Sequence, residues 1–246
     1  MDVHPTVNVP RGAISGKEST GQLAQVFRCR AALQGHPGSA TVFSTMKGKP
    51  DYYWRKSKEE GYPARSVFKL QEIQEKHRIV KPGNRVLDLG VSPGSWSLFI
   101  LDLLAGAGGV VGVDLNEPDR KLLSRKGFRF VHGDFTAEEV ARQLVEAGPF
   151  DAVVSDAAPS TMGNRTRDTE RSLDIARAVL ALCEKSLAPG GNCLLKIFQG
   201  GGEKEILDRM RRLFSGARAF KPKASRPDSM ETYYIGTGFS PAERRG

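Results

Sequence analysis

The chain has 246 residues, of which 39% are hydrophobic and 26% are charged, which is typical of a soluble globular protein with one sizeable domain and an extension. No apolar run approaches the roughly 18 residues of a membrane helix and no apolar signal core opens the chain, so we expect no membrane and no secretion. The net charge of +9 suits a polyanionic partner, although an ordinary basic protein explains it equally well, and the three cysteines lack metal-ligand spacing, which argues against a structural zinc and favours a reducing cytoplasm.

The composition divides the chain into four segments. Residues 1–45 are rich in Gly, Ser, Thr and Pro without a sustained period, and we predict a disordered extension. This extension is either genuine or a mis-assigned start, with translation beginning at Met46. Residues 46–61 form a basic, aromatic lead-in, residues 62–238 form one regular domain, and residues 239–246 form a tail.

Within the regular domain, apolar spacing predicts alternating helices and strands. The first helix is predicted from Ala64 to Lys76, and Pro82-Gly83 ends this unit. The predicted strands are Arg85–Leu89, Val110–Asp114, Phe128–His132, Ala152–Ser155, Asn192–Phe198, Ala217–Lys221 and Thr232–Thr237. The later helices are predicted at Ser95–Leu104, Glu117–Lys126, Ala137–Ala147, Thr169–Leu187 and Glu203–Phe214. This alternation predicts an α/β fold with a mostly parallel seven-stranded sheet and helices on both faces, whose last two strands form a hairpin that adds one antiparallel strand.

Small and acidic residues follow the first three predicted strands. Gly90 and Gly94 allow the backbone to turn tightly and to approach a ligand closely. Asp114 ends the second strand, where its carboxylate can accept hydrogen bonds from an adenosine ribose, and Asp134 follows the third, where it suits the adenine amino group. Either acid alone could be an ordinary turn residue, but sites at three strand ends favour an adenosine-bearing cofactor. The spacing Gly-x-x-x-Gly, with a proline inside it, argues against a pyrophosphate nest.

The fourth and fifth predicted strands carry candidates for chemistry. The fourth strand leads into Ser155-Asp156-Ala157-Ala158-Pro159, which lacks the Asp/Asn-Pro-Pro-Tyr/Phe motif of amino-methylating enzymes. Lys196 lies inside the apolar fifth strand, where a charged and unpaired lysine is costly. Two interpretations stay open, because Lys196 is either a proton acceptor or relay for a ribose hydroxyl or an edge lysine that reaches solvent.

Several motifs together resemble those of the FtsJ/RrmJ-like ribose 2′-O-methyltransferases, over about residues 55–238. They are Ser66–Ile73, Asp88–Gly90 with Pro93–Ser97, Ser155–Pro159, Leu187–Gly191, Lys196–Gly200, and Ser225-Arg226 followed by Glu231–Tyr234. The resemblance implies a Rossmann-like, S-adenosylmethionine-dependent methyltransferase domain over residues 62–238. It further implies that the substrate is a uridine 2′-hydroxyl of 23S (large-subunit) ribosomal RNA.

The same resemblance implies a catalytic Lys-Asp-Lys-Glu tetrad. Its members here are Lys69, Asp156, Lys196 and Glu231, which we call the tetrad. Lys196 is implied to be the base or proton relay, oriented by Asp156, while Lys69 and Glu231 hold the ribose and tune Lys196. Two lysines interleaved with two carboxylates nearly balance in charge, so a partly dry cleft can hold them. In-line alignment of the methyl donor with the hydroxyl oxygen would then supply much of the rate.

The resemblance also implies a set of cofactor contacts, with one local departure from the family pattern. The contacts are Gly94, Trp96, Asp114, Asp134 and Asp156. Ser95 stands where many relatives have a second glycine before the tryptophan, and Val91-Ser92 replaces the commoner small pair. We expect Ser95 to cap the following helix and to alter the loop geometry without loss of cofactor binding.

Basic residues recur around the predicted cleft and would hold RNA phosphates without reading sequence. They are Arg55, Lys56, Lys58, Arg65, Arg165, Arg167, Lys221, Lys223 and Arg226. The aromatic residues Tyr52, Tyr53 and Trp54 either stack on bases or pack against the core.

Two other functions remain open beside the ribosomal RNA enzyme. One is a tRNA ribose methyltransferase on the same scaffold, and the other is a catalytically silent RNA-binding ribosome assembly factor. The single compact domain and the short basic lead-in favour ribosomal RNA, and the intact tetrad argues against a silent factor. We expect no metal, and a monomer is favoured.

Overall fold

The structure is a computed structural model that describes residues 52–159, 163–226 and 228–240, all within one compact unit. The predicted extension over residues 1–45, residues 46–51 of the lead-in and residues 241–246 of the tail lie outside the described residues. Among the helices of the described part, none is long and apolar enough to cross a membrane.

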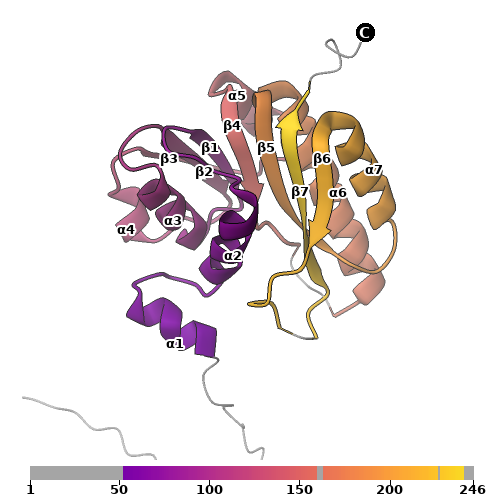
Figure 1. The fold of residues 1–246 in the computed structure, drawn as a ribbon, viewed down its shortest axis with the longest axis horizontal. Coiled ribbons are helices and arrows are strands. Elements are labelled where there is room, and N and C mark those ends of the chain that lie inside the picture. The colour runs from indigo at the N-terminus through magenta and orange to yellow at the C-terminus, as the bar shows by residue number, and fades with distance from the viewer. Residues whose placement is uncertain (1–51, 160–162, 227, 241–246) are drawn as a thin grey trace, which may run out of the picture. The chain divides into compact units, whose positions relative to one another are not determined.

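Seven strands form a single sheet in the order β3-β2-β1-β4-β5-β7-β6 (Figure 1). The strands are β1 Arg85–Leu89, β2 Gly109–Asp114, β3 Phe128–His132, β4 Phe150–Ser155, β5 Leu187–Phe198, β6 Phe214–Phe220 and β7 Glu231–Phe239. The pairs from β3 through β5 are parallel, whereas β7 runs antiparallel to both β5 and β6. The mostly parallel seven-stranded sheet and its one inserted antiparallel strand are therefore confirmed.

Helices cover both faces of the sheet, as the alternation of helical and strand patterns predicted. They are α1 Tyr52–Glu59, α2 Val67–His77, α3 Ser95–Leu103, α4 Arg120–Leu123, α5 Glu138–Glu146, α6 Arg165–Ser186 and α7 Glu203–Leu213. Strand side chains alternate between two cores, because successive residues of a strand point to opposite faces. Leu87 and Val153 pack with α5, α6 and α7 on one face, whereas Val86 and Val154 pack with α2, α3 and α4 on the other.

One helix prediction was wrong in extent, and one helix was not predicted. The helix predicted over Glu117–Lys126 is the single turn α4, because the backbone before a proline avoids the helical region and Asp119 then caps the turn. The Asp119 side chain accepts a hydrogen bond from the Lys121 backbone N–H at 2.8 Å. In the lead-in, where no helix was predicted, the structure forms α1.

The order of the strands places the site. From β1 the chain adds β2 and β3 on one side of the sheet and then crosses over to add β4 on the other side of β1. Ligands of open α/β sheets bind outside the carboxyl ends of the strands at such a change of side. Asp88 near the end of β1, Asp114 at the end of β2 and Asp156 just after β4 are thereby gathered at one edge.

Candidate active site

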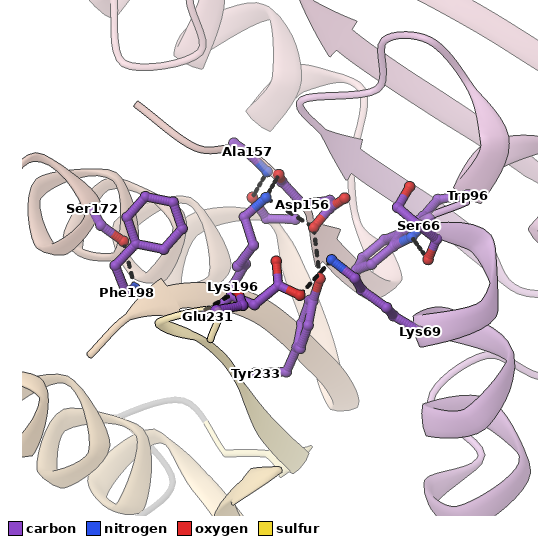
Figure 2. Close-up of polar contacts among 12 residues, drawn as sticks. Ser66, Lys69, Trp96, Asp156, Ala157, Ser172, Lys196, Phe198, Glu231 and Tyr233 are labelled. Atoms are coloured by element: carbon purple, nitrogen blue, oxygen red, sulfur yellow. Dashed lines mark hydrogen bonds and ion pairs between the residues drawn. The ribbon is translucent and has the colours of Figure 1, made fainter. Parts of the chain in front are cut away.

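The four tetrad residues, from four separate segments, meet in two ion pairs (Figure 2). Lys69 Nζ of α2 lies 2.5 Å from Glu231 Oε1 at the start of β7. Lys196 Nζ of β5 lies 3.0 Å from Asp156 Oδ1, just after β4, and also donates to the Asp156 backbone carbonyl. All four side chains are between 9% and 19% exposed. The Lys196 side chain is therefore largely buried and paired and does not extend into solvent, which excludes the edge-lysine interpretation, whereas its role in proton transfer stays a prediction.

Strand register explains why these residues meet. In the β5–β7 ladder, Phe198 stands opposite Glu231 and Lys196 stands opposite Tyr233. In the β4–β5 ladder, Ser155 stands opposite Leu195, so the chain leaving β4 brings Asp156 beside Lys196. The antiparallel insertion of β7 next to β5 therefore delivers the carboxylate of Glu231 to an edge otherwise built from parallel strand ends.

Tyr233 is a residue of this cluster that the sequence analysis did not single out. Its hydroxyl donates a hydrogen bond of 2.8 Å to Asp156 Oδ1, the oxygen that also contacts Lys196. Burial raises the pKa of the Tyr233 hydroxyl well above its usual value, and the carboxylates of Asp156 and Glu231 raise it further, so the hydroxyl stays a donor. Its spacing of two from Glu231, which puts both side chains on one face of a strand, is the signal that could have found it.

A cavity of about 750 Å³ lies at the strand ends next to the tetrad, and the three predicted cofactor acids, Asp114, Asp134 and Asp156, all line it. The Asp114 carboxylate is held by two backbone N–H groups, those of Ser92 at 3.0 Å and Asn116 at 2.9 Å. Asp134 accepts hydrogen bonds from the backbone N–H and the hydroxyl of Thr136, at 2.8 Å and 2.7 Å. These bonds fix the acids before any ligand binds.

The cavity suits a cationic group that carries adenosine. Its carboxylates can accept hydrogen bonds from hydroxyl and amino groups, and its walls include the apolar side chains of Leu115, Phe135 and Ile175. Ile175 comes from α6, together with Arg171 four residues earlier, and the sequence analysis named neither. Residues four apart lie on one face of a helix, so this spacing is the feature of the sequence that could have predicted their place in the cavity wall.

The other two predicted cofactor residues, Gly94 and Trp96, are not among the residues that line this cavity. Trp96 is 3% exposed, donates from Nε1 to the Ser66 carbonyl at 3.0 Å, and packs its ring 5.8 Å from that of Tyr233. It therefore ties α3 to the start of α2 and to Tyr233, whose hydroxyl contacts the tetrad residue Asp156. The cofactor contacts at Gly94 and Trp96 stay predictions.

Glycines shape the loop that follows β1. Gly90 has a φ of 82°, and a Cβ there would lie 2.8 Å from the Ala157 backbone. Gly94 has a φ of 112°, and a Cβ there would lie 2.6 Å from the Leu122 side chain. Both positions therefore need glycine for conformation and for space.

The predicted role of Ser95 as a helix cap was wrong. Gly94 occupies the cap position of α3, and no side chain caps that end. Ser95 instead accepts a hydrogen bond from the Ala64 backbone N–H at 2.7 Å. The side chain that replaces the family glycine thus joins α3 to the segment before α2, because that segment passes directly over the start of the helix.

Asp88 is a buried acid behind the cavity. It is 1% exposed, and the Ser97 hydroxyl donates to its Oδ2 at 2.6 Å. Burial raises the pKa of Asp88 to about 7, while the hydrogen bond from Ser97 opposes the rise and the charges of Asp156 and Asp114 add to it. The site therefore holds a carboxyl group that titrates near neutrality.

Part of the predicted basic rim reaches the tetrad. Arg65 lies just before α2, and Arg226 lies in the connection between β6 and β7. Burial and the charge of Arg226 lower the pKa of Arg65, and the Glu231 carboxylate opposes the shift. The Arg65 charge thus lies near both Arg226 and Glu231, and two neighbouring cations favour an anionic ligand at this edge.

Comparison with known proteins agrees with this geometry. Residues 62–239 match the family described as FtsJ-like methyltransferase. A Treponema denticola protein named ribosomal RNA large subunit methyltransferase E is 43% identical over 191 residues, which cover 78% of this chain and 96% of the relative. A Syntrophobacter fumaroxidans protein of the same name is 46% identical over 187 residues, 76% of this chain and 94% of the relative.

The fold has a counterpart among solved structures. The crystal structure of a Plasmodium falciparum protein described as a ribosomal RNA methyltransferase superposes with a TM-score of 0.64 at 24% identity, covering 72% of this chain and 98% of that one. At that identity the likeness shows the fold, which is the Rossmann-like fold of S-adenosylmethionine-dependent methyltransferases. With the family match spanning well over half of its length, the chain belongs to the FtsJ-like methyltransferase family.

Proposed function

We propose that this protein uses S-adenosylmethionine to methylate a ribose 2′-hydroxyl, that of a uridine in 23S (large-subunit) ribosomal RNA. The observation that carries the proposal is the position of Asp156, which lines the cofactor cavity and holds Lys196 Nζ at 3.0 Å. One carboxylate thereby connects the methyl-donor site with the amine that handles the proton. The names of the relatives at 43% and 46% identity support large-subunit ribosomal RNA as the substrate.

The residues divide the work by position. S-adenosylmethionine, when bound, supplies an electrophilic methyl group. Asp114 and Asp134 bind its adenosine, and the turn at Gly90 allows close approach. Asp156 orients the Lys196 amine toward the acceptor hydroxyl, and Lys196 accepts or relays the hydroxyl proton. Alignment in a fixed geometry is the main contribution of the protein.

The second ion pair completes the acceptor site. Lys69 and Glu231 offer one cation and one anion beside Lys196, and these can bind the hydroxyls of the acceptor ribose. All four residues come from a single chain, so we propose that a monomer is active, and that it acts in the cytoplasm together with its RNA.

The test is methyl transfer from labelled cofactor, with Lys196→Ala compared against Lys185→Ala, an exposed lysine on α6. We expect Lys196→Ala to lose about 100-fold or more of turnover, as for removal of a general base, while cofactor affinity stays unchanged. The Lys185→Ala variant should resemble wild type. Near wild-type turnover in Lys196→Ala would show that the base is another group.

The substrate is tested with deproteinised 23S ribosomal RNA, assembled large subunits and tRNA, followed by mass-spectrometric mapping of the ribose methylation. Label at one uridine of the ribosomal RNA is the expected result. Label on tRNA alone would show that the protein is a tRNA ribose methyltransferase. RNA binding without any label would identify a silent assembly factor.

A further inference from the structure

The short helix α1 exposes two large aromatic side chains. Tyr52 is 62% exposed and Trp54 is 47% exposed. Arg55 lies beside them, exposed and without an ion pair among the described residues. Large aromatic rings contribute most to stability when they are buried, so two on one short helix indicate a surface that binds a partner.

The opposite side of α1 is firmly packed. The Tyr53 ring lies 5.4 Å from the Phe68 ring, and Lys56 Nζ lies 4.9 Å from the centroid of the same ring. Ser57 is fully buried, and its hydroxyl donates to the Trp54 carbonyl at 2.8 Å. With 3.6 residues per turn, anchoring at Tyr53, Lys56 and Ser57 directs Tyr52, Trp54 and Arg55 outward. Around the helix axis, Lys58 lies between Trp54 and Arg55. We call Tyr52, Trp54, Arg55 and Lys58 the α1 outer face.

The anchor of α1 connects it to the tetrad. Phe68 directly precedes Lys69 in the sequence and packs with Val67 and Ala224. Ala224 belongs to the connection between β6 and β7 that leads to Glu231. Helix α1 therefore rests on the two segments that supply Lys69 and Glu231, and Figure 1 shows it next to α2. Because the outer face points away from Phe68, a ligand there would lie across the helix, about 10 Å in diameter, from the segment that supplies Lys69.

We propose that the α1 outer face binds unpaired nucleotides of the substrate RNA that flank the target ribose. Trp54 and Tyr52 stack on bases, which every base permits because each has a π-face. Arg55 binds a phosphate, and Lys58, whose Nζ donates to the Pro63 carbonyl at 3.2 Å, adds positive charge beside it. The net charge of +9 and the exposed cations complement a polyanion. The inference rests on the proposed function, because it assumes an RNA substrate.

The first test compares variants of the full chain in methylation of deproteinised ribosomal RNA. Trp54→Ala should raise KM for RNA about tenfold, toward the lower end of what one stacked base contributes, with kcat and cofactor affinity unchanged. Trp54→Phe should recover most of the loss. Arg55→Ala should reduce the slope of log affinity against log salt concentration by about one, which is the contribution of one phosphate contact. Leu123→Ala, which changes another exposed apolar side chain, on α4, should have no effect.

The second test is spectroscopic and independent of turnover. The chain has two tryptophans, and Trp96 is 3% exposed, so emission that acrylamide can quench reports on Trp54. Deproteinised RNA should quench this emission and protect it from acrylamide, and Trp54→Phe should remove the signal. Emission that is already protected in the free protein would mean that another part of the chain covers the face, which would overturn the inference.

The outcomes separate the inference from the proposed function. An unchanged KM for RNA in Trp54→Ala, with methylation intact, would overturn RNA docking on α1 and leave the proposed function standing. A loss confined to assembled large subunits would assign the face to a protein partner, which also overturns it. Absence of ribosomal RNA methylation by the wild-type protein would instead refute the proposed function.

Discussion

The buried carboxyl group of Asp88 makes the stability of this protein depend on pH in a defined way. Burial raises its pKa to about 7 from the usual 3.8. Between these two values the folded protein keeps a proton that the unfolded chain has lost. The stabilisation that this bound proton contributes is therefore complete below about pH 4, declines as the pH rises, and is fully lost above about pH 7.

The size of the effect follows from the two pKa values. They differ by about three units, and each unit corresponds to 1.36 kcal/mol, so the full loss is about 4 kcal/mol. Asp88→Asn keeps the shape of the protonated acid and can still accept the hydrogen bond from Ser97, but it cannot titrate. The free energy of unfolding of wild type minus that of Asp88→Asn should fall by about 3 kcal/mol between pH 4.5 and pH 8.

Urea unfolding followed by circular dichroism, at constant ionic strength and half-unit steps of pH, measures this difference. Ser97→Ala is the matched control, because it removes the hydrogen bond that lowers the pKa of Asp88 and should extend the decline to higher pH. A difference between wild type and Asp88→Asn that stays constant over this range, or grows with pH, would refute the reasoning. It would mean that the folded protein holds Asp88 ionised throughout.

Two further predictions concern the tetrad and the cavity. Lys69→Met or Glu231→Gln should each destabilise the protein by about 3 kcal/mol in urea unfolding, because either leaves a buried charge unpaired, and the double variant should cost less than the two together. Additive losses would show that the ion pair contributes nothing. Gly90→Ala should weaken cofactor binding about tenfold or more by calorimetry, since its Cβ would lie 2.8 Å from the Ala157 backbone. Gly83→Ala, at the same φ of 82° but with open space around it, is the control, and equal affinities would exclude the close approach as the cause.

Much of the fold could be predicted from the sequence because its signals are local. The strands β1 and β3 begin and end at the predicted residues, and the others differ at their ends. Hydrophobic alternation and the glycines and prolines between elements act over a few residues, so they are readable without tertiary contacts. The four tetrad residues were identified through the family resemblance, and spacing alone left Lys196 with two interpretations.

The tertiary structure decided what depends on partners distant in the sequence. It paired Lys196 with Asp156, added Tyr233 to the same oxygen, and turned Ser95 from a cap into an acceptor for Ala64. It also decided between the two interpretations of Tyr53 in the aromatic lead-in, because this ring packs on Phe68.

In that lead-in, Tyr52 and Trp54 remain exposed while their neighbour is covered. Adjacent residues of one helix differ in this way because the packing surface of α2 covers a single side of α1. Composition and periodicity determine which segments become helices or strands, whereas burial, pairing and pKa depend on which other segments the fold brings against them.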